Sequence, residues 1–365
     1  MGSIFSKEND MNQDQALFYE YCNTDRFHDL NDKVVAITGT SANSLGFFLG
    51  EVAIRKNVKL LLLLNRDSET SRAGKEGLEK ILADNADYKT EIKSIKCDLM
   101  DFHCVKDAGK QVNEITKQYG GLDVLICNSG IMAKNDERTD AGFDIQMQTN
   151  QISHFLLVSI VYPMLELAGK NRGDARLVMH SSGARFFPKK NLEQKYFEKC
   201  KPGTLGGNRM MWDFLGRGGP WTRYHMTKLS NACFAMEMHH RLKKLPQTNN
   251  VMALAADPGV ASSGLYGSAT SGNGAMSGIL ARLLMGTGQS TADGSLPAAM
   301  AAFSDQALSG DFWAPRFQRK GAPIKTIEET SDVEHKSREK LTLTTANQEN
   351  VWKWCEEALD IKFQL

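Results

Sequence analysis

Short apolar runs alternate with longer amphipathic segments along the chain from Lys33 onward. The short runs are rich in leucine and β-branched residues, which is typical of buried strands, and the longer segments have the apolar spacing of helices that bury one face. We therefore expect strands at residues 34–38, 59–65, 91–97, 124–128, 176–181 and 251–257. Strands that alternate with helices build a parallel sheet with helices on both faces, so the pattern predicts an α/β fold.

Three stretches interrupt the alternation: a polar leader before Leu30, a segment rich in Gly, Lys and aromatic residues, and a Gly/Ser-rich segment. We interpret residues 1–30 as an N-terminal extension and residues 31–365 as one doubly wound (Rossmann) domain. The other two stretches are insertions, at about 185–223 and 264–294. No linker divides the chain into separate cores.

Composition agrees with one large globular unit, since 41% of the 365 residues are hydrophobic and 24% are charged. Lys plus Arg (44) nearly balance Asp plus Glu (43), so the basic excess of a nucleic-acid-binding protein is missing and we expect no nucleic-acid partner. The longest apolar stretch, residues 155–168, contains polar residues and falls short of the ~20 residues that span a bilayer. No transmembrane helix is predicted.

The cysteines and histidines predict neither disulfides nor metal. The seven cysteines are odd in number, form no Cys-x-x-Cys pair and follow no secretory signal, which is typical of reduced, mostly buried thiols in a cytoplasmic protein. No histidine pair has a carboxylate or cysteine partner at zinc-site spacing, and the adjacent His239 and His240 face different ways on a helix. We expect no metal site.

The N-terminus matches the pattern for N-myristoylation, with Gly2 after the initiator methionine and Ser6 at the position that takes Ser or Thr. The alternative is an ordinary start without a lipid. One myristoyl chain gives only marginal membrane affinity, and Lys7 alone is a weak second signal. If Gly2 is acylated, we expect weak, reversible attachment of a cytoplasmic protein to a membrane.

A turn of small residues follows the first predicted strand. Residues 38–46 read Thr-Gly-Thr-Ser-Ala-Asn-Ser-Leu-Gly and lead into an apolar helix, so backbone N–H groups and the helix N-terminus can approach a pyrophosphate. Asp98-Leu99 follows the third strand, and Cys127-Asn128-Ser129-Gly130 follows the fourth. Both lie at the carboxyl edge of the sheet, where such ligands bind.

With these motifs in this order, the chain from about Lys33 to its C-terminus resembles the short-chain dehydrogenase/reductase family, in particular its retinol-dehydrogenase-like and protochlorophyllide-reductase-like members. The family's Thr-Gly-x-x-x-Gly-x-Gly turn corresponds to residues 38–46, its Asn-Asn-Ala-Gly segment to residues 127–130, and its Pro-Gly cofactor contact to residues 258–259. The resemblance implies cofactor contacts from Gly39, Ser41, Ser44, Leu45, Gly46, Asp98, Leu99, Asn128, Ser129, Gly130, Pro258 and Gly259.

The chain departs from the family pattern at two positions. Ser44 replaces the middle glycine of a turn that is one residue longer, and Cys127 replaces the first asparagine. Two outcomes are open at Ser44: its Cβ crowds the pyrophosphate, or its hydroxyl donates to a phosphate oxygen. The resemblance places Asp98 at the adenine edge, and a helix N-cap is the alternative role for this residue.

The end of the second predicted strand bears on the choice of cofactor. An acidic residue there would bind the ribose 2′-OH of NAD, whereas Asn65 is uncharged and Arg66 can pair with the 2′-phosphate of NADP. The alternative for Arg66 is a solvated surface position. We expect NADP(H) as the cofactor.

Tyr224 and Lys228 lie one turn apart on a predicted helix, and no other of the eight tyrosines has a lysine at that spacing. They follow Asn150 and Ser182 in the family's catalytic order. A phenol has a pKa of ~10, which a nearby ammonium lowers. The resemblance implies that Tyr224 donates the proton, that Lys228 tunes it and holds the nicotinamide ribose, that Ser182 binds the substrate oxygen, and that Asn150 holds a water linked to Lys228. Ser181 is the alternative to Ser182.

The insertions bear on the substrate. The first carries Phe186, Phe187, Tyr196, Met210, Met211, Trp212, Phe214 and Trp221, and the second has an apolar run at residues 279–285. They predict either walls for a bulky lipophilic substrate or surface excursions and an oligomer contact. We expect an NADP-dependent oxidoreductase for a retinoid-, steroid- or pigment-like carbonyl or alcohol. The alternative is a catalytically inactive relative that serves as a structural or nucleotide-sensing subunit of a larger assembly.

Overall fold

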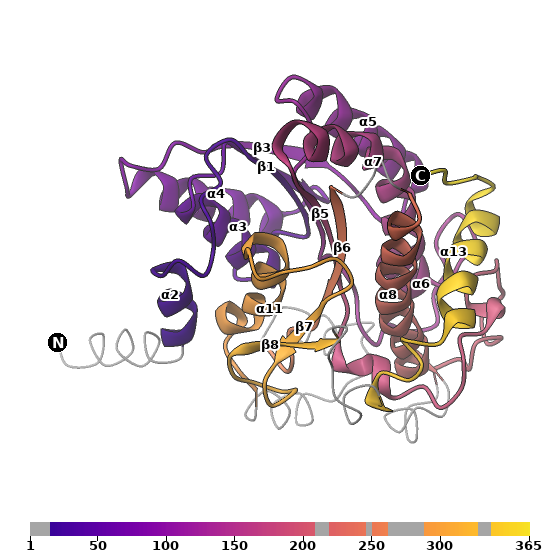
Figure 1. Cartoon of the computed structure of the whole chain (residues 1–365). Helices are drawn as coiled ribbons and strands as arrows, with labels where there is room; N and C mark the ends of the chain where they lie inside the picture. The colour runs from indigo at the N-terminus through magenta and orange to yellow at the C-terminus, as the bar shows by residue number, and fades with distance from the viewer. Residues whose placement is uncertain (1–14, 209–218, 246–249, 262–287, 328–336) are drawn as a thin grey trace.

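An eight-stranded sheet in the order β3-β2-β1-β4-β5-β6-β7-β8 forms the centre of the molecule (Figure 1). The computed structural model describes residues 15–208, 219–245, 250–261, 288–327 and 337–365. The strands are β1 (Val34–Thr38), β2 (Leu60–Asn65), β3 (Glu91–Lys96), β4 (Val124–Cys127), β5 (Ala175–His180), β6 (Val251–Ala256), β7 (Phe312–Pro315) and β8 (Pro323–Ile327). Strands β1 to β7 pair in parallel, and β8 is antiparallel to β7.

The predicted α/β doubly wound fold is confirmed, and each of the six predicted strands lies within one residue of its expected bounds. The hairpin β7–β8 was not predicted. Both of its strands are short and carry a proline at one end, which weakens the alternating pattern on which a strand prediction rests. Proline is tolerated there because β8 lies at the edge of the sheet.

Helices cover both faces of the sheet. The helices on one face are α5 (Phe102–Lys117), α7 (Ser153–Arg172), α8 (Pro220–Lys243) and α13 (Thr345–Leu359), on the right in Figure 1. Those on the other face are α2 (Ala16–Cys22), α3 (Leu45–Arg55), α4 (Glu69–Ala83) and α11 (Thr291–Phe303). Along β1, Val34 and Ala36 join the first hydrophobic core while Val35 and Ile37 join the second, so this strand is buried on both faces.

Residues 15–30, which belong to the predicted N-terminal extension, pack on the fold. Phe18, Phe27 and Leu30 are buried in the core beside α3 and α11, and the Phe18 backbone N–H donates to the Asp293 carboxylate at the start of α11. The five buried apolar residues of this segment are spaced among polar ones and did not stand out in the sequence, although Phe18 and Tyr21 have the spacing of one helix face.

Residues 145–172, which end with α7, are the one run among the described helices long and apolar enough to cross a membrane by length and composition. Most of this run is buried against α5 and the sheet, so its composition is that of a core helix.

The seven cysteines are free, and five of them are buried, as composition predicted. Burial raises the pKa of Cys22 and Cys97 to about 12, which keeps both thiols protonated and unreactive at neutral pH.

Candidate active site

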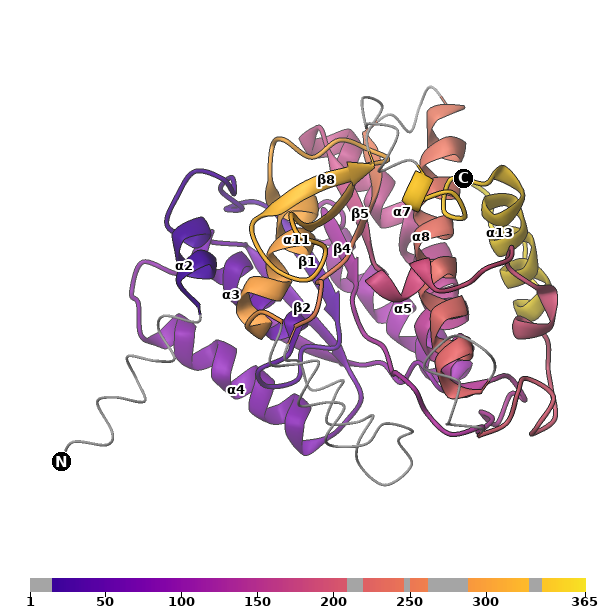
Figure 2. The same cartoon turned by 90° about the horizontal axis from the view of Figure 1, so that it is seen from below.

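Two cavities adjoin at the carboxyl ends of the parallel strands. Figure 2 is viewed from this side of the sheet. The glycine-turn cleft, of about 340 Å³, is lined by residues that follow β1 to β4, and the Tyr224 cavity, of about 350 Å³, by residues that follow β5 and β6 and by α8. Of the predicted residues, the cleft contains Gly39, Ser41, Ser44, Leu45, Arg66, Asp98, Leu99, Asn128, Ser129 and Gly130, and the cavity contains Ser182, Tyr224, Lys228, Pro258 and Gly259. Gly46 and Asn150 line neither and contact residues that do.

Glycine is required at two positions of the turn after β1. Gly39 has a φ of +78°, and a Cβ there would lie 2.9 Å from the Ser129 side chain. A Cβ on Gly46 would lie 2.3 Å from the Gly39 carbonyl oxygen. These contacts hold the turn tightly against the segment after β4, which leaves backbone N–H groups at the cleft wall.

Ser44 has a structural role that was not considered from the sequence, and its effect on a pyrophosphate stays a prediction. It is the N-cap of α3, because its Oγ accepts from the Phe47 backbone N–H at 3.1 Å and donates to the Gly39 carbonyl at 3.2 Å. The hydroxyl is therefore committed to the fold of the turn. Asn43, at φ +57°, supplies the left-handed residue that the longer turn needs.

Amide side chains fasten this turn from both sides. Asn65 Oδ1 accepts from the Thr40 backbone N–H at 2.8 Å, and Asn128 Nδ2 donates to the carbonyls of Thr38 and Gly39 at 2.9 and 3.0 Å. Asn65 is therefore used in holding the turn. Arg66, the next residue, is exposed at the rim of the cleft.

Asp98 lines the cleft and forms a local turn. Its Oδ1 accepts from the Met100 backbone N–H at 3.0 Å. The N-cap of α5 is Asp101, whose Oδ1 accepts from the His103 backbone N–H at 2.8 Å. Of the two roles considered for Asp98, the N-cap role therefore belongs to Asp101.

Tyr224 and Lys228 come from one face of α8 and are both buried at the wall of the cavity. The Lys228 Nζ lies 5.9 Å from the centre of the Tyr224 ring and donates to the His180 carbonyl at 3.0 Å. Burial lowers the pKa of Lys228 to about 8, and Asp257 opposes this shift. A lysine with this pKa exchanges its proton near neutral pH, which suits it to proton transfer.

The two serines after β5 have different partners. Ser181 is buried, and its Oγ donates to the Lys228 carbonyl at 2.7 Å. Ser182 is partly exposed on the cavity wall, where its Oγ accepts from the Ala184 backbone N–H at 3.3 Å and begins the short helix η2 (Gly183–Phe186). Because its proton is not used in that contact, Ser182 is the serine that suits a hydrogen bond to a ligand.

Asn150 lies in a π-helical turn, η1 (Gln148–Ile152), which joins the short helix α6 (Ile145–Met147) to α7. Its Oδ1 accepts from the Ile131 N–H at 2.8 Å, and its Nδ2 donates to the Ile131 carbonyl and to Thr227 Oγ1. All side-chain polar atoms of Asn150 are thus engaged by protein. These bonds give Asn150 a positioning role beneath α8, and its role as the ligand of a water linked to Lys228 stays a prediction.

Three buried histidines, His154, His180 and His225, lie around the predicted catalytic residues, and from the sequence they were considered only as metal ligands. Burial lowers the pKa of His180 and His225 to about 3 and that of His154 to about 4, so all three are neutral at pH 7. His180 Nδ1 lies 2.9 Å from Asn128 Oδ1, which can only accept. The one sequence signal that could have placed a histidine at the site was the position of His180 directly before Ser181 and Ser182. No group of three metal-ligating side chains occurs among the described residues.

An arginine that sequence reasoning missed fastens the cavity wall. Arg185 is fully buried, donates from Nη1 to Asp257 and from Nη2 to Glu339 at 2.6 Å, and lies between the rings of Phe186 and Phe312. Asp257 Oδ1 accepts in turn from the Gly259 N–H at 2.8 Å. The pair thus ties the segment after β5 to the Pro258–Gly259 turn. Asp257 adjoins a recognised motif, but nothing in the sequence linked Glu339 to it.

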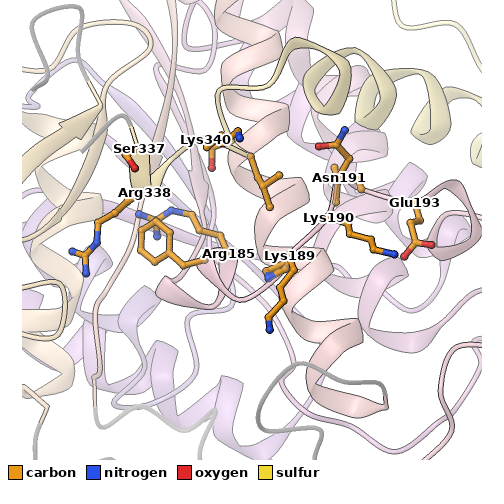
Figure 3. Close-up of a pocket in the computed structure, with 13 residues that line it drawn as sticks. Arg185, Lys189, Lys190, Asn191, Glu193, Ser337, Arg338 and Lys340 are labelled. Atoms are coloured by element: carbon orange, nitrogen blue, oxygen red, sulfur yellow. The ribbon is translucent and has the colours of Figure 1, made fainter. Parts of the chain in front are cut away.

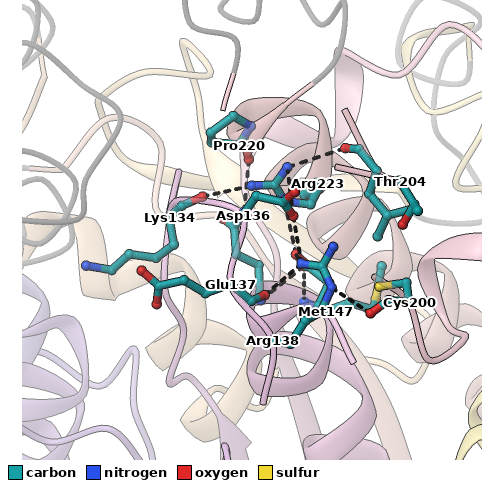
Figure 4. Close-up of polar contacts among 12 residues, drawn as sticks. Lys134, Asp136, Glu137, Arg138, Met147, Cys200, Thr204, Pro220 and Arg223 are labelled. Atoms are coloured by element: carbon teal, nitrogen blue, oxygen red, sulfur yellow. Dashed lines mark hydrogen bonds and ion pairs between the residues drawn. The ribbon is translucent and has the colours of Figure 1, made fainter. Parts of the chain in front are cut away.

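A second buried arginine anchors the helix that carries Tyr224. Arg223 forms an ion pair with Asp144, at 3.0 Å. It lies 3.8 Å from Asp136, which Figure 4 shows beside it. It also donates to the carbonyls of Lys134 and Gly207 at 3.0 and 2.8 Å. Because Arg223 precedes Tyr224, these contacts fix the first turn of α8 and with it the tyrosine.

The first insertion supplies part of the apolar wall. Phe186, Phe187 and Trp221 line the Tyr224 cavity, and Phe187 stacks on His225 with ring centres 4.8 Å apart. Tyr196 does not line it, which corrects its assignment: it is buried in the core on the α13 side, in the short helix η3 (Gln194–Tyr196). Met210, Met211, Trp212, Phe214 and residues 279–285 lie outside the described residues.

The fold and the two cavities define a doubly wound protein with a dinucleotide-type turn beside a buried Tyr-x-x-x-Lys pair. A family model described as short chain dehydrogenase matches residues 33–194. A short chain dehydrogenase/reductase from Colletotrichum higginsianum is 27% identical over 234 residues, which cover 63% of this chain and 55% of that protein. Polyprenol dehydrogenase from Homo sapiens is 23% identical over 235 residues, which cover 64% of this chain and 62% of that protein.

Solved structures share the fold. An uncharacterised protein from Mycobacterium paratuberculosis, 24% identical, has a TM-score of 0.63 over 93% of this chain and 97% of that one. An NADPH-bound carbonyl reductase from chicken fatty liver, 17% identical, has a TM-score of 0.52 over 82% of this chain and 97% of that one. Residues 33–194 match the short-chain dehydrogenase/reductase family, as the motifs of the sequence predicted, and relatives with short-chain dehydrogenase names support the assignment. The match spans less than two thirds of the length of the first relatives, from 55% to 63%.

Proposed function

We propose that this protein is an NADP-dependent oxidoreductase that transfers hydride between nicotinamide and a bulky lipophilic carbonyl or alcohol. The observation that carries the proposal is the burial of Tyr224 and Lys228 in a cavity that adjoins the glycine-turn cleft. The family match, and relatives with oxidoreductase names, support the reaction class.

The glycine-turn cleft suits a dinucleotide. A Cβ at Gly39 or Gly46 would collide with its walls, the first residues of α3 line it, and Arg66 stands at its rim. Gly39, Ser41 and Leu45 would hold the pyrophosphate, Arg66 the 2′-phosphate, and Asn128 to Gly130 with Pro258–Gly259 the nicotinamide half. When bound, NADP(H) supplies or accepts the hydride.

The residues of the Tyr224 cavity supply the proton chemistry. In the reduction direction, the Tyr224 hydroxyl donates its proton to the substrate oxygen, which Ser182 holds by a hydrogen bond. The Lys228 ammonium stabilises the resulting phenolate and supplies the proton that restores the phenol; with a pKa of about 8, the neutral amine then regains a proton from solvent. Phe186, Phe187 and Trp221 make the wall apolar, which supports a lipophilic substrate.

A screen for NADPH oxidation tests the proposal. Purified protein is mixed with NADPH and a panel of lipophilic aldehydes, ketones and enones, and the matching alcohols are tested with NADP⁺. We expect turnover of at least one bulky apolar substrate and none of small polar ones. Absence of both NADPH binding and turnover would favour the alternative of a structural subunit in a larger assembly.

We also propose that the protein is cytoplasmic and that an acyl chain on Gly2 attaches it weakly to a membrane. Gly2 and Ser6 lie outside the described residues, so the sequence pattern alone supports this. Intact-mass measurement on protein from its native source should show a myristoyl group. A free or acetylated N-terminus would end the proposal.

A further inference from the structure

Three segments surround the mouth of the Tyr224 cavity. Residues 186–190 begin at the last residue of η2, residues 316–320 lie in the turn of the β7–β8 hairpin, and residues 337–340 precede α13. Phe187, Arg319 and Arg338, one from each segment, line the cavity. We call these three segments the rim surface.

The rim surface exposes aromatic side chains. Phe187 is 49% exposed and Phe317 is 70% exposed, and they are two of the four large apolar side chains that stand exposed in the described part of the chain. Phe187 is fixed by its stacking on His225, and Phe317 packs along Gly321. Exposed aromatics held at loop tips are typical of a surface that contacts another apolar phase.

The same surface carries a concentration of positive charge. A basic cavity of about 700 Å³ shares Phe186 and Arg338 with the rim of the Tyr224 cavity (Figure 3). Its exposed cations are Lys189, Lys190, Arg338 and Lys340. The hairpin turn adds Arg316, Arg319 and Lys320.

Few carboxylates offset these cations among the described residues. Glu339 is buried and paired with Arg185, and Glu193 pairs with Lys195 at 2.8 Å. Residues 328–336, which contain four acidic residues, lie outside the described part of the chain. The described residues of the rim surface thus carry seven exposed cations, in a protein whose net charge is only +1.

We propose that the rim surface docks on an anionic lipid bilayer, with Phe187 and Phe317 in the interface and the surrounding lysines and arginines on the headgroups. Cations near such a surface contribute about 1 kcal/mol each, and aromatic rings favour the interface. An acidic protein partner would pair with the cations, but it would leave the rings of Phe187 and Phe317 in contact with water. The inference goes beyond the proposed function, because docking requires neither cofactor nor turnover.

Docking in this orientation would turn the mouth of the Tyr224 cavity toward the bilayer, since the rim residues line that mouth. A lipophilic molecule dissolved in the membrane would then reach Tyr224 without crossing water. The rim surface would also act as the second signal that a single acyl chain at Gly2 needs for stable attachment.

Vesicle co-sedimentation tests the proposal with full-length Gly2→Ala protein, so that no acyl chain contributes. We expect binding to phosphatidylcholine vesicles that contain phosphatidylserine, weaker binding to phosphatidylcholine alone, and release by salt. Replacing Lys189, Lys190, Arg338 and Lys340 by alanine should weaken binding by about a hundred- to a thousandfold. The matched control replaces Lys106, Lys110 and Lys117, exposed on α5, and should bind as the parent does.

A Phe187→Ser, Phe317→Ser variant separates a bilayer from a polyanion. We expect it to lose binding to anionic vesicles while its affinity for soluble polyglutamate stays the same. Equal binding to neutral and anionic vesicles, or no binding to either, would overturn the proposal. Loss of vesicle binding in the lysine variant but not in the phenylalanine variant would also overturn it, because the surface would then recognise charge alone.

Discussion

The glycine-turn cleft and the Tyr224 cavity share a wall but are built in different ways. In the cleft, the side chains of Ser44, Asn65 and Asn128 form hydrogen bonds with the backbone of the turn itself. In the cavity, Lys228 and His180 are buried with pKa values displaced to about 8 and about 3. The glycine-turn cleft is thus organised to keep the shape of its backbone turn. The Tyr224 cavity is organised to hold groups that can take part in proton transfer.

Lys228→Met changes the Tyr224 cavity and should have the largest effect on turnover. We expect turnover to fall by about 10²–10⁴ and cofactor binding to weaken, because the ammonium tunes Tyr224 and is expected to hold the ribose. Enzyme assays and calorimetric titration measure both. Lys244→Met, an exposed residue at the end of the same helix, is the control and should change neither.

The same variant also has a stability signature. Because the pKa of Lys228 is lowered from 10.5 to about 8, the unfolded chain binds its proton more tightly, so the stability of the cofactor-free protein should rise between pH 8 and 10.5. Lys228→Met should remove this rise and add on the order of 1–3 kcal/mol at pH 7. Denaturant titrations at several pH values would contradict the account if the two proteins behaved alike.

Glu339→Leu tests, through the stability of the protein, the buried ion pair that holds the wall of the Tyr224 cavity. It removes one partner of the buried Arg185, which should lower the free energy of unfolding by about 3–5 kcal/mol. Glu193→Leu breaks an exposed pair with Lys195 and should cost less than about 1 kcal/mol. Equal destabilisation of the two variants in urea titrations would contradict a structural role for the Arg185 pair.

Arg66→Ala tests the one charged contact assigned to the cleft. A charge-assisted bond to the 2′-phosphate contributes about 1.5–3 kcal/mol, so the preference for NADPH over NADH should fall roughly ten- to a hundredfold. Arg72→Ala, which removes the exposed partner of Asp67, is the matched control. An unchanged preference in calorimetric titration would remove Arg66 from the site.

Ser44→Ala should have the smallest effect and tests whether the cleft works by shape. Loss of the α3 N-cap should cost about 1 kcal/mol of stability while NADPH affinity stays within a few fold. Ser290→Ala, which removes the N-cap of α11, should cost a similar amount. A loss of NADPH affinity of tenfold or more in Ser44→Ala alone would mean that the hydroxyl binds phosphate.

Six strands of the sheet and the residues at their carboxyl ends could be predicted because they depend on local patterns. Apolar runs predicted six of the seven parallel strands among the described residues, and motif order predicted that Ser182, Tyr224 and Lys228 lie together. The hairpin β7–β8 and the packing of residues 15–30 were missed because their apolar residues are few or interrupted by proline.

Contacts between distant segments left no local pattern. Arg185 and Glu339 are 154 residues apart, and only the fold brings them together. The cap formed by Ser44 depends on the turn geometry, and the side-chain partners of Asn150 depend on the π-helical turn. The neutral histidines follow from burial, which a single sequence shows poorly for a polar residue.

Tyr224→Phe tests the central claim most directly, because it removes one oxygen and keeps the ring that packs at the cavity wall. With a substrate from the NADPH-oxidation screen, kcat and NADPH affinity are measured for both proteins. The account predicts an unchanged NADPH affinity and a kcat lower by about 10²–10⁴. A variant that binds NADPH and retains full turnover would contradict the role of Tyr224 as the proton donor.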